Sequence, residues 1–221
     1  MTSKINLEPV LRYLAELSKN NNKTWFEQHR ADYEAGRRLF EQFIDIIIDE
    51  FRAEDDLQDL SARDCIGRIY RDIRFSRDKS PYRTNMWATV APGGKHAPHM
   101  GYYIAIQPEG QSIVAGGMWD PSSEQLGKFR QAIHEDAEEF RTIIQARSFV
   151  ENFGMLEGEK LKTAPQGYDK SHPEIELLKF KQIMAVQHYP DNRVAVGDFP
   201  GQVITACRAM RPFINFLDQF K

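Results

Sequence analysis

The chain has 221 residues, 41% of them hydrophobic and 28% charged, and its formal net charge at pH 7 is −3. This composition is ordinary for a globular protein, and the length fits one domain spanning residues 1–221 with a substantial core. The acidic balance counts against a generic nucleic-acid-binding domain, which is usually strongly basic. No apolar stretch approaches the ~20 residues that a membrane-spanning helix needs, so no membrane segment is expected.

Two features favour the cytoplasm. The first six residues, Met1 to Asn6, are not followed by the apolar stretch of a secretory signal. Cys65 and Cys207 are the only cysteines, and they lie far apart without the spacing of metal ligands. This usage fits a reducing compartment, in which both thiols pack as small apolar groups.

The N-terminal part of the chain has helical periodicity. Leucine and valine recur at helical spacing from Leu7 to Leu17, which predicts a first short helix. Asn20 to Asn22 are typical of a turn. The stretch Thr24 to Glu27 has the pattern of a capping box, so we expect it to open one longer helix with an apolar stripe that ends at Phe51.

Strand-like segments follow, and the links between the later ones are short. Residues 66–71, 86–90, 101–106 and 112–117 each have the length and β-rich composition of a strand. Pro92–Gly94 and Pro108–Gly110 are turn-like links, which favour antiparallel pairing because parallel strands need long crossovers.

Helical periodicity returns after Asp120, with one apolar stripe from Leu126 to Ile144. A second capping box is expected at Ser171, a further strand over residues 183–188, and a last helix over residues 200–220 that Pro212 should kink. The predicted fold is therefore α+β, a single domain whose antiparallel sheet is flanked by N-terminal and C-terminal helices.

Positive charge is concentrated in one segment of this acidic chain. Seven basic and three acidic residues lie between Arg63 and Arg83, a local charge of +4, so the rest of the chain carries −7. If the segment starts as a strand, alternation places Ile69, Arg71, Ile73 and Phe75 on one face. Arg71 then lies among apolar neighbours, where an unpaired guanidinium is costly, so it requires an anionic partner. Asp72 and Asp78 are the local candidates.

The same segment resembles the signature R-x-x-R-D-x-R-F-x-x-[DN]-K-x-x-Y of a family of bacterial and fungal proteins of about this length, a domain of unknown function. Every defined position of that signature is matched, by Arg68, Arg71, Asp72, Arg74, Phe75, Asp78, Lys79 and Tyr82. The resemblance extends along the chain to the stretches 22–26, 101–103, 116–119, 161–168 and 172–173. It implies a shared site between Arg68 and Tyr82 and no particular activity.

We expect this segment to bind a small anionic ligand that carries a phosphate or carboxylate group. The candidate ligand-binding residues are Arg68, Arg71, Arg74, Asp78, Lys79, Tyr82 and Arg83. Whether the protein is an enzyme stays open. If it is one, Asp72 and Tyr82 are the candidates for the general acid–base group, because no catalytic histidine is evident.

Two alternatives remain for the same residues. The arginines could all pair internally, as a salt-bridge lock in a protein-interaction domain. They could also bind nucleic acid together with neighbouring aromatic residues, against which the acidic total charge counts. The oligomeric state is open.

No metal or cofactor is expected. His96 and His99 lie three apart in a Gly/Pro-rich turn, where a solvated loop is favoured over a metal site. Gly93–Gly94 lacks the spacing of the nucleotide-binding glycine motifs.

Overall fold

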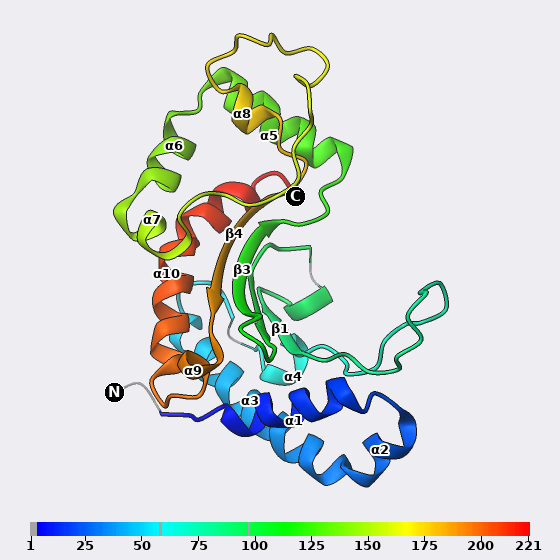
Figure 1. Ribbon diagram of the computed structural model, residues 1–221. Helices are drawn as coiled ribbons and strands as arrows, with labels where there is room; N and C mark the ends of the chain where they lie inside the picture. The colour runs from blue at the N-terminus through cyan, green and yellow to red at the C-terminus, as the bar shows by residue number, and fades with distance from the viewer. Residues whose placement is uncertain (1–3, 58, 97) are drawn as a thin grey trace. The chain divides into compact units, whose positions relative to one another are not determined.

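A computed structural model describes residues 4–57, 59–96 and 98–221 of the chain (Figure 1). Its N-terminal part contains four helices: α1 (Glu8–Lys19), α2 (Lys23–Gln28), α3 (Arg30–Phe51) and α4 (Ala62–Cys65). The first predicted helix is therefore present as α1, with its leucines buried along one face.

The expected capping box at Thr24 is wrong, because the cap lies two residues earlier. The Asn22 side chain accepts a hydrogen bond from the Trp25 backbone N–H, so Asn22 is the N-cap of α2. The single long helix is wrong as well. Its backbone leaves helical geometry at His29, whose φ is −112° and ψ is 21°, and α3 begins after it.

Four strands form one sheet in the order β1-β2-β3-β4. They are β1 (Met86–Val90), β2 (Tyr102–Ile106), β3 (Ser112–Met118) and β4 (Ile183–Tyr189). β1 and β2 pair antiparallel, with Ala88 opposite Ile104. The predicted fold class is confirmed: the chain has an antiparallel four-stranded sheet with helices at both ends, an α+β fold.

The expected strand over residues 66–71 is absent. That segment makes two isolated antiparallel bridges, Ile66 to Ala88 and Tyr70 to Tyr82, and no continuous ladder. The physical reason is that the segment changes its pairing partner. Beyond Ile69 it pairs with the returning half of its own loop, so no continuous ladder with β1 forms.

The remaining helices are shorter than the sequence pattern suggests, apart from the last. They are α5 (Ser123–Glu135), α6 (Glu138–Gln145), α7 (Arg147–Phe153), α8 (Ile175–Leu178), α9 (Asp191–Val194) and α10 (Phe199–Asp218), with a 3-10 turn at Gly94–His96. The expected helix up to Ile144 is divided because Asp136 is extended. The Ser171 capping box is wrong: Ser171 bonds Asp169, and α8 starts after Glu174 without a side-chain cap. Pro212 lies inside α10, which continues through it.

Contacts divide the chain into two compact units, each assembled from separated segments. The described residues of Met1–Ala97, Tyr102–Val114 and His188–Thr205 form the first unit, and Pro98–Gly101, Ala115–Gln187 and Ala206–Lys221 form the second. Both units have aromatic cores. Phe43 stacks on Phe199 at 5.6 Å in the first, and Phe140 lies 5.0 Å from Phe216 in the second.

Both cysteines, Cys65 and Cys207, are buried. Among the described residues, no helix is long and apolar enough to cross a membrane.

Gly67 marks a close approach between the chain and β1. A Cβ atom at this position would lie 2.0 Å from the Trp87 ring, which itself packs on Tyr103 at 5.9 Å. We expect Gly67→Ala to lower the free energy of unfolding by about 1–3 kcal/mol, because the ring has to shift. Urea unfolding measures this.

Gly127→Ala is the matched control. A Cβ atom at Gly127, inside α5, meets nothing within 4 Å. That substitution should raise the free energy of unfolding by about 0.5–1 kcal/mol, as alanine favours helix. Equal effects of the two substitutions would contradict the assigned packing at Gly67.

Candidate functional site

The segment between α4 and β1 runs out as a long excursion and returns to start β1 (Figure 1). At its base the two halves are hydrogen-bonded: Arg71 N–H donates to the Pro81 carbonyl at 2.9 Å, and Arg83 N–H donates to the Ile69 carbonyl at 2.7 Å. Residues 68–83 therefore form a hairpin whose tip is solvent-exposed, and we refer to it below as the motif hairpin.

Tyr82 anchors the hairpin to the N-terminal helices. Its side chain is 3% exposed, and its ring stacks on Phe26 of α2 at 4.0 Å with an interplanar angle of 11°. The Asn21 side chain bonds both backbone groups of Tyr82, donating to the carbonyl at 2.9 Å and accepting from the N–H at 3.1 Å. These two hydrogen bonds resemble those that a neighbouring strand makes, and they attach the base of the hairpin to the turn between α1 and α2.

Asp78 is the carboxylate that pairs with Arg71. The Arg71 side chain is half-buried, and its Nη1 donates to Asp78 Oδ2. Asp78 Oδ1 accepts from the Ser80 hydroxyl at 2.7 Å and from the Ser80 N–H at 2.9 Å. The Ser80 bonds, followed by the Arg71 guanidinium, hold the pKa of Asp78 well below its usual range.

The charged side chains at the tip of the hairpin bond within the hairpin itself. Arg74 binds Asp72 with two atoms, Nε to Oδ1 at 2.9 Å and Nη2 to Oδ2 at 2.6 Å. Lys79 Nζ donates to the Ile73 carbonyl at 3.0 Å. Phe75 does not share an apolar face with Arg71, contrary to the predicted alternation. It is 95% exposed because the chain turns at the tip, where Ser76 N–H bonds the Ile73 carbonyl.

A cavity of about 400 Å³ lies at the base of the hairpin. Its lining is almost wholly polar: Ser18, Asn21, Arg71, Asp78, Ser80, Tyr82, Arg83, Thr84, Asn85 and Gln107. Four of the residues expected to bind a ligand are among them, namely Arg71, Asp78, Tyr82 and Arg83. The other expected residues, Arg68, Arg74 and Lys79, and the candidate acid–base residue Asp72, do not line this cavity.

The lining of the cavity has a net positive charge and contains a hydrogen-bond acceptor without a donor. Two arginines and one carboxylate line it: Arg71 pairs with Asp78, while no carboxylate of the described residues pairs with Arg83. The Arg83 guanidinium lies 5.8 Å from the centre of the Trp87 ring. Asn85 Oδ1 is buried, and no donor in the described chain bonds it.

The candidate acid–base groups are not tuned for proton transfer near neutral pH. Hydrogen bonding by Arg74 lowers the pKa of Asp72. Burial, assisted by the nearby Tyr70, raises the pKa of Tyr82. A general acid or base works best with a pKa near the working pH, and both shifts move away from it.

A protein family described as "Conserved hypothetical protein (DUF2461)" matches residues 9–216. The chain belongs to this family. No curated protein and no solved structure matches the chain. The DUF2461 match includes the motif hairpin and every residue that lines its cavity, so the site lies within the shared part of the chain.

Sequence reasoning missed the uncharged half of the cavity. Asn21 belongs to a stretch of three asparagines, which indicates a turn but not a contact with Tyr82, 61 residues later. Asn85 follows the signature by three positions, and only its burial distinguishes it. Gln107 directly follows β2, and only the pairing of β2 within the sheet brings it to the cavity. None of these has a spacing that identifies it.

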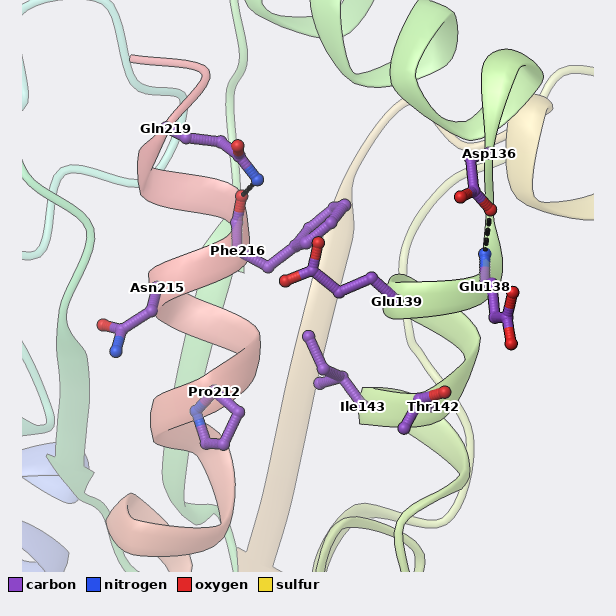
Figure 2. A pocket seen from close by; sticks show the side chains of 9 residues that line it. All are labelled: Asp136, Glu138, Glu139, Thr142, Ile143, Pro212, Asn215, Phe216 and Gln219. Carbon is purple, nitrogen blue, oxygen red and sulfur yellow. Dashed lines mark hydrogen bonds between the residues drawn. The ribbon is translucent and has the colours of Figure 1, made fainter.

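A larger cavity, about 710 Å³, lies in the second unit between α6 and α10 (Figure 2). Glu139 and Ile143 project from α6 toward Phe216 of α10, and Asp136 and Glu138 lie at the start of α6. Its lining includes three carboxylates and no cationic side chain. The charge of this lining is therefore opposite to that of the hairpin cavity in this DUF2461 protein.

Two histidines that are distant in sequence meet on the second unit. His134 of α5 and His172 lie with Nδ1 and Nε2 at 2.9 Å. Glu174 N–H donates to His172 Nδ1, so the neutral ring carries its proton on Nε2 and donates to His134. Among the described residues, no cluster of three or more histidine, cysteine or acidic side chains is arranged to hold a metal ion.

The carboxyl pKa of Asp78 tests the hydrogen bonds at the cavity. Because the pKa of Asp78 is lower in the folded state, these contacts stabilise the folded hairpin at pH values above the ordinary aspartate pKa of about 3.9. This stabilisation is lost as the pH falls through the pKa of Asp78 in the folded protein. We expect a carbon-detected NMR titration of Asp78 to give a midpoint well below 3.9, and Ser80→Ala to raise it, because Ser80 is the main cause.

Ser76→Ala is the control for that titration, since the Ser76 hydroxyl accepts from Arg71 and has no bond to Asp78. The titration midpoint of Asp78 in the Ser76→Ala variant should match that in the unmodified protein. A midpoint near the ordinary aspartate value, or one that Ser80→Ala leaves unchanged, would contradict the assigned contacts.

Proposed function

We propose that the cavity at the base of the motif hairpin binds a small anionic ligand that carries a phosphate or carboxylate group. The observation that carries this proposal is the charge of the cavity, where Arg71 and Arg83 face a single carboxylate. Guanidinium groups bind such anions through paired, charge-assisted hydrogen bonds. A volume of about 400 Å³ lies within the range of small-molecule sites.

The uncharged residues of the lining restrict the chemical class of the ligand further. Asn85 Oδ1 needs a donor, and leaving a buried acceptor unpaired costs about 1–3 kcal/mol. An anion that also carries an O–H group, such as hydrogen phosphate or a hydroxy acid, supplies this donor. Thr84 offers a further hydroxyl group in the same lining.

Asp78 has a positioning role in this proposal. It holds the Arg71 guanidinium at the cavity and partly neutralises it, so an incoming anion meets Arg83 first and shares Arg71 with Asp78. We also place this binding protein in the cytoplasm, which the burial of its two cysteines supports, because such usage fits a reducing compartment.

Calorimetric titration with inorganic phosphate tests the proposal, with sulfate and lactate as further probes. We expect saturable binding to the unmodified protein and a loss of at least about tenfold in affinity for Arg83→Ala, equivalent to about 1.4 kcal/mol. Asp78→Asn should bind phosphate more tightly, because the competing carboxylate is gone.

Arg77→Ala is the matched control, because it removes the same charge from the same hairpin without touching the cavity lining. It should bind phosphate as the unmodified protein does. An equal loss for Arg77→Ala and Arg83→Ala, or no binding of any probe, would rule the anion site out. Lower stability of Asp78→Asn with no anion binding would instead favour an internal salt-bridge lock.

A protein-interaction role for the hairpin is the second candidate, and its exposed tip favours it. Phe75 is 95% exposed and Tyr70 is 52% exposed, with the Arg74 guanidinium 5.9 Å from the centre of the Phe75 ring. Exposed aromatic and arginine side chains are enriched at the energetic centres of protein interfaces.

Nucleic-acid binding by the same hairpin is tested with a fluorescent single-stranded oligonucleotide. If the hairpin binds nucleic acid, the measured affinity should fall steeply as the salt concentration rises.

A further inference from the structure

A second cavity, separate from the motif hairpin site, lies among the N-terminal helices. It has a volume of about 370 Å³ and is lined by residues of α1, α2 and α3 with the intervening His29. The side chains that give it chemical character are Arg12, Tyr13, Glu16, Trp25, His29 and Asp32. None of these residues lines the hairpin cavity.

Aromatic rings form one part of its lining. Trp25 and His29 stack at 4.0 Å with an interplanar angle of 15°, and the Tyr13 ring lies 5.8 Å from the Trp25 ring. His29 Nδ1 donates to the Trp25 carbonyl at 2.9 Å, since a carbonyl can only accept, and this bond holds the imidazole in place. The electron-rich faces of such rings attract cations.

The charged residues of the lining leave a carboxylate free. Arg12 lies 3.9 Å from Glu8, and Glu16 bonds Lys19 at 2.9 Å. Asp32 has no ion-pair partner among the described residues, and it stands in the first turn of α3, where the helix dipole favours a negative charge. A carboxyl group without an ion-pair partner among the described residues thus lies in the same lining as the aromatic rings.

Tyr13 supplies the observation that points to a ligand. Its side chain is 7% exposed, yet its buried hydroxyl has no hydrogen-bond partner in the described part of the chain. Burial, together with the neighbouring Tyr33 and Asp32, raises the pKa of Tyr13, so the phenol stays protonated. Buried hydroxyl groups are normally bonded, and an unbonded one needs an explanation.

We propose that this cavity binds the primary ammonium group of an organic amine. The ammonium N–H groups would donate to the Tyr13 hydroxyl and the Asp32 carboxylate, while the alkyl part packs against Trp25. This ligand class satisfies the three features together: a free carboxylate, aromatic rings and an unpaired hydroxyl oxygen. A quaternary ammonium would use the first two and leave Tyr13 without a donor.

Three small probes of equal chain length test the proposal by calorimetry on the full chain. Pentylamine is protonated at neutral pH, 1-pentanol lacks its charge, and pentyltrimethylammonium keeps the charge without N–H groups. We expect pentylamine to bind at least about tenfold more tightly than either of the others. Equal binding of pentylamine and pentanol, or no saturable binding at millimolar concentration, would overturn the proposal.

Two substitutions locate the binding. Tyr13→Phe removes only the unpaired hydroxyl, so the protein should stay at least as stable to urea while pentylamine affinity falls about tenfold. Asp32→Asn should weaken pentylamine binding by a similar factor. Glu34→Gln is its control, because this exposed α3 residue does not line the cavity. If Asp32→Asn and Glu34→Gln have equal effects, or Tyr13→Phe binds pentylamine normally, the site is wrongly placed.

Discussion

The stacking of Tyr82 on Phe26 is the contact on which both candidate sites depend. It joins the base of the motif hairpin to α2, and the Asn21 side chain fixes the backbone at the same point. The aromatic cluster continues from Phe26 to Tyr33, and from there to Tyr13. The hairpin cavity and the cavity among the N-terminal helices therefore border one aromatic cluster, to which Tyr82 and Tyr13 both belong.

Charge in the motif hairpin has two different uses. At the exposed tip, the bonds of Arg74 to Asp72 and of Lys79 to a carbonyl shape the loop, and such exposed pairs contribute little net stability. At the base, the half-buried Arg71 is paired with Asp78, while Arg83 has no carboxylate partner in the described chain. The motif hairpin thus combines a self-paired tip with a base whose cavity is lined by two arginines and one carboxylate.

Much of the architecture follows from local sequence patterns. Helical spacing of leucines predicts α1. The β-rich runs predict β1 to β4, together with a strand over residues 66–71 that is absent, and the short turn-like links predict antiparallel pairing among β1, β2 and β3, because these signals depend on near neighbours. Helix boundaries were predicted less well, at His29 and at Asp136, where one apolar stripe continues across a break in the backbone. Periodicity reports which face is buried and is insensitive to such breaks. The signature also includes three of the residues that line the hairpin cavity, Arg71, Asp78 and Tyr82.

The sequence alone determined that the chain is α+β, where its positive charge lies, and that Arg71 needs an anionic partner. Only the tertiary structure decided which carboxylate that partner is, that Tyr82 is a buried anchor, and that Phe75 is exposed. The unpaired Asn85 oxygen and Tyr13 hydroxyl became visible only there as well. The physical reason is that pairing and burial depend on contacts between residues far apart in sequence, which local propensity and charge patterns do not encode.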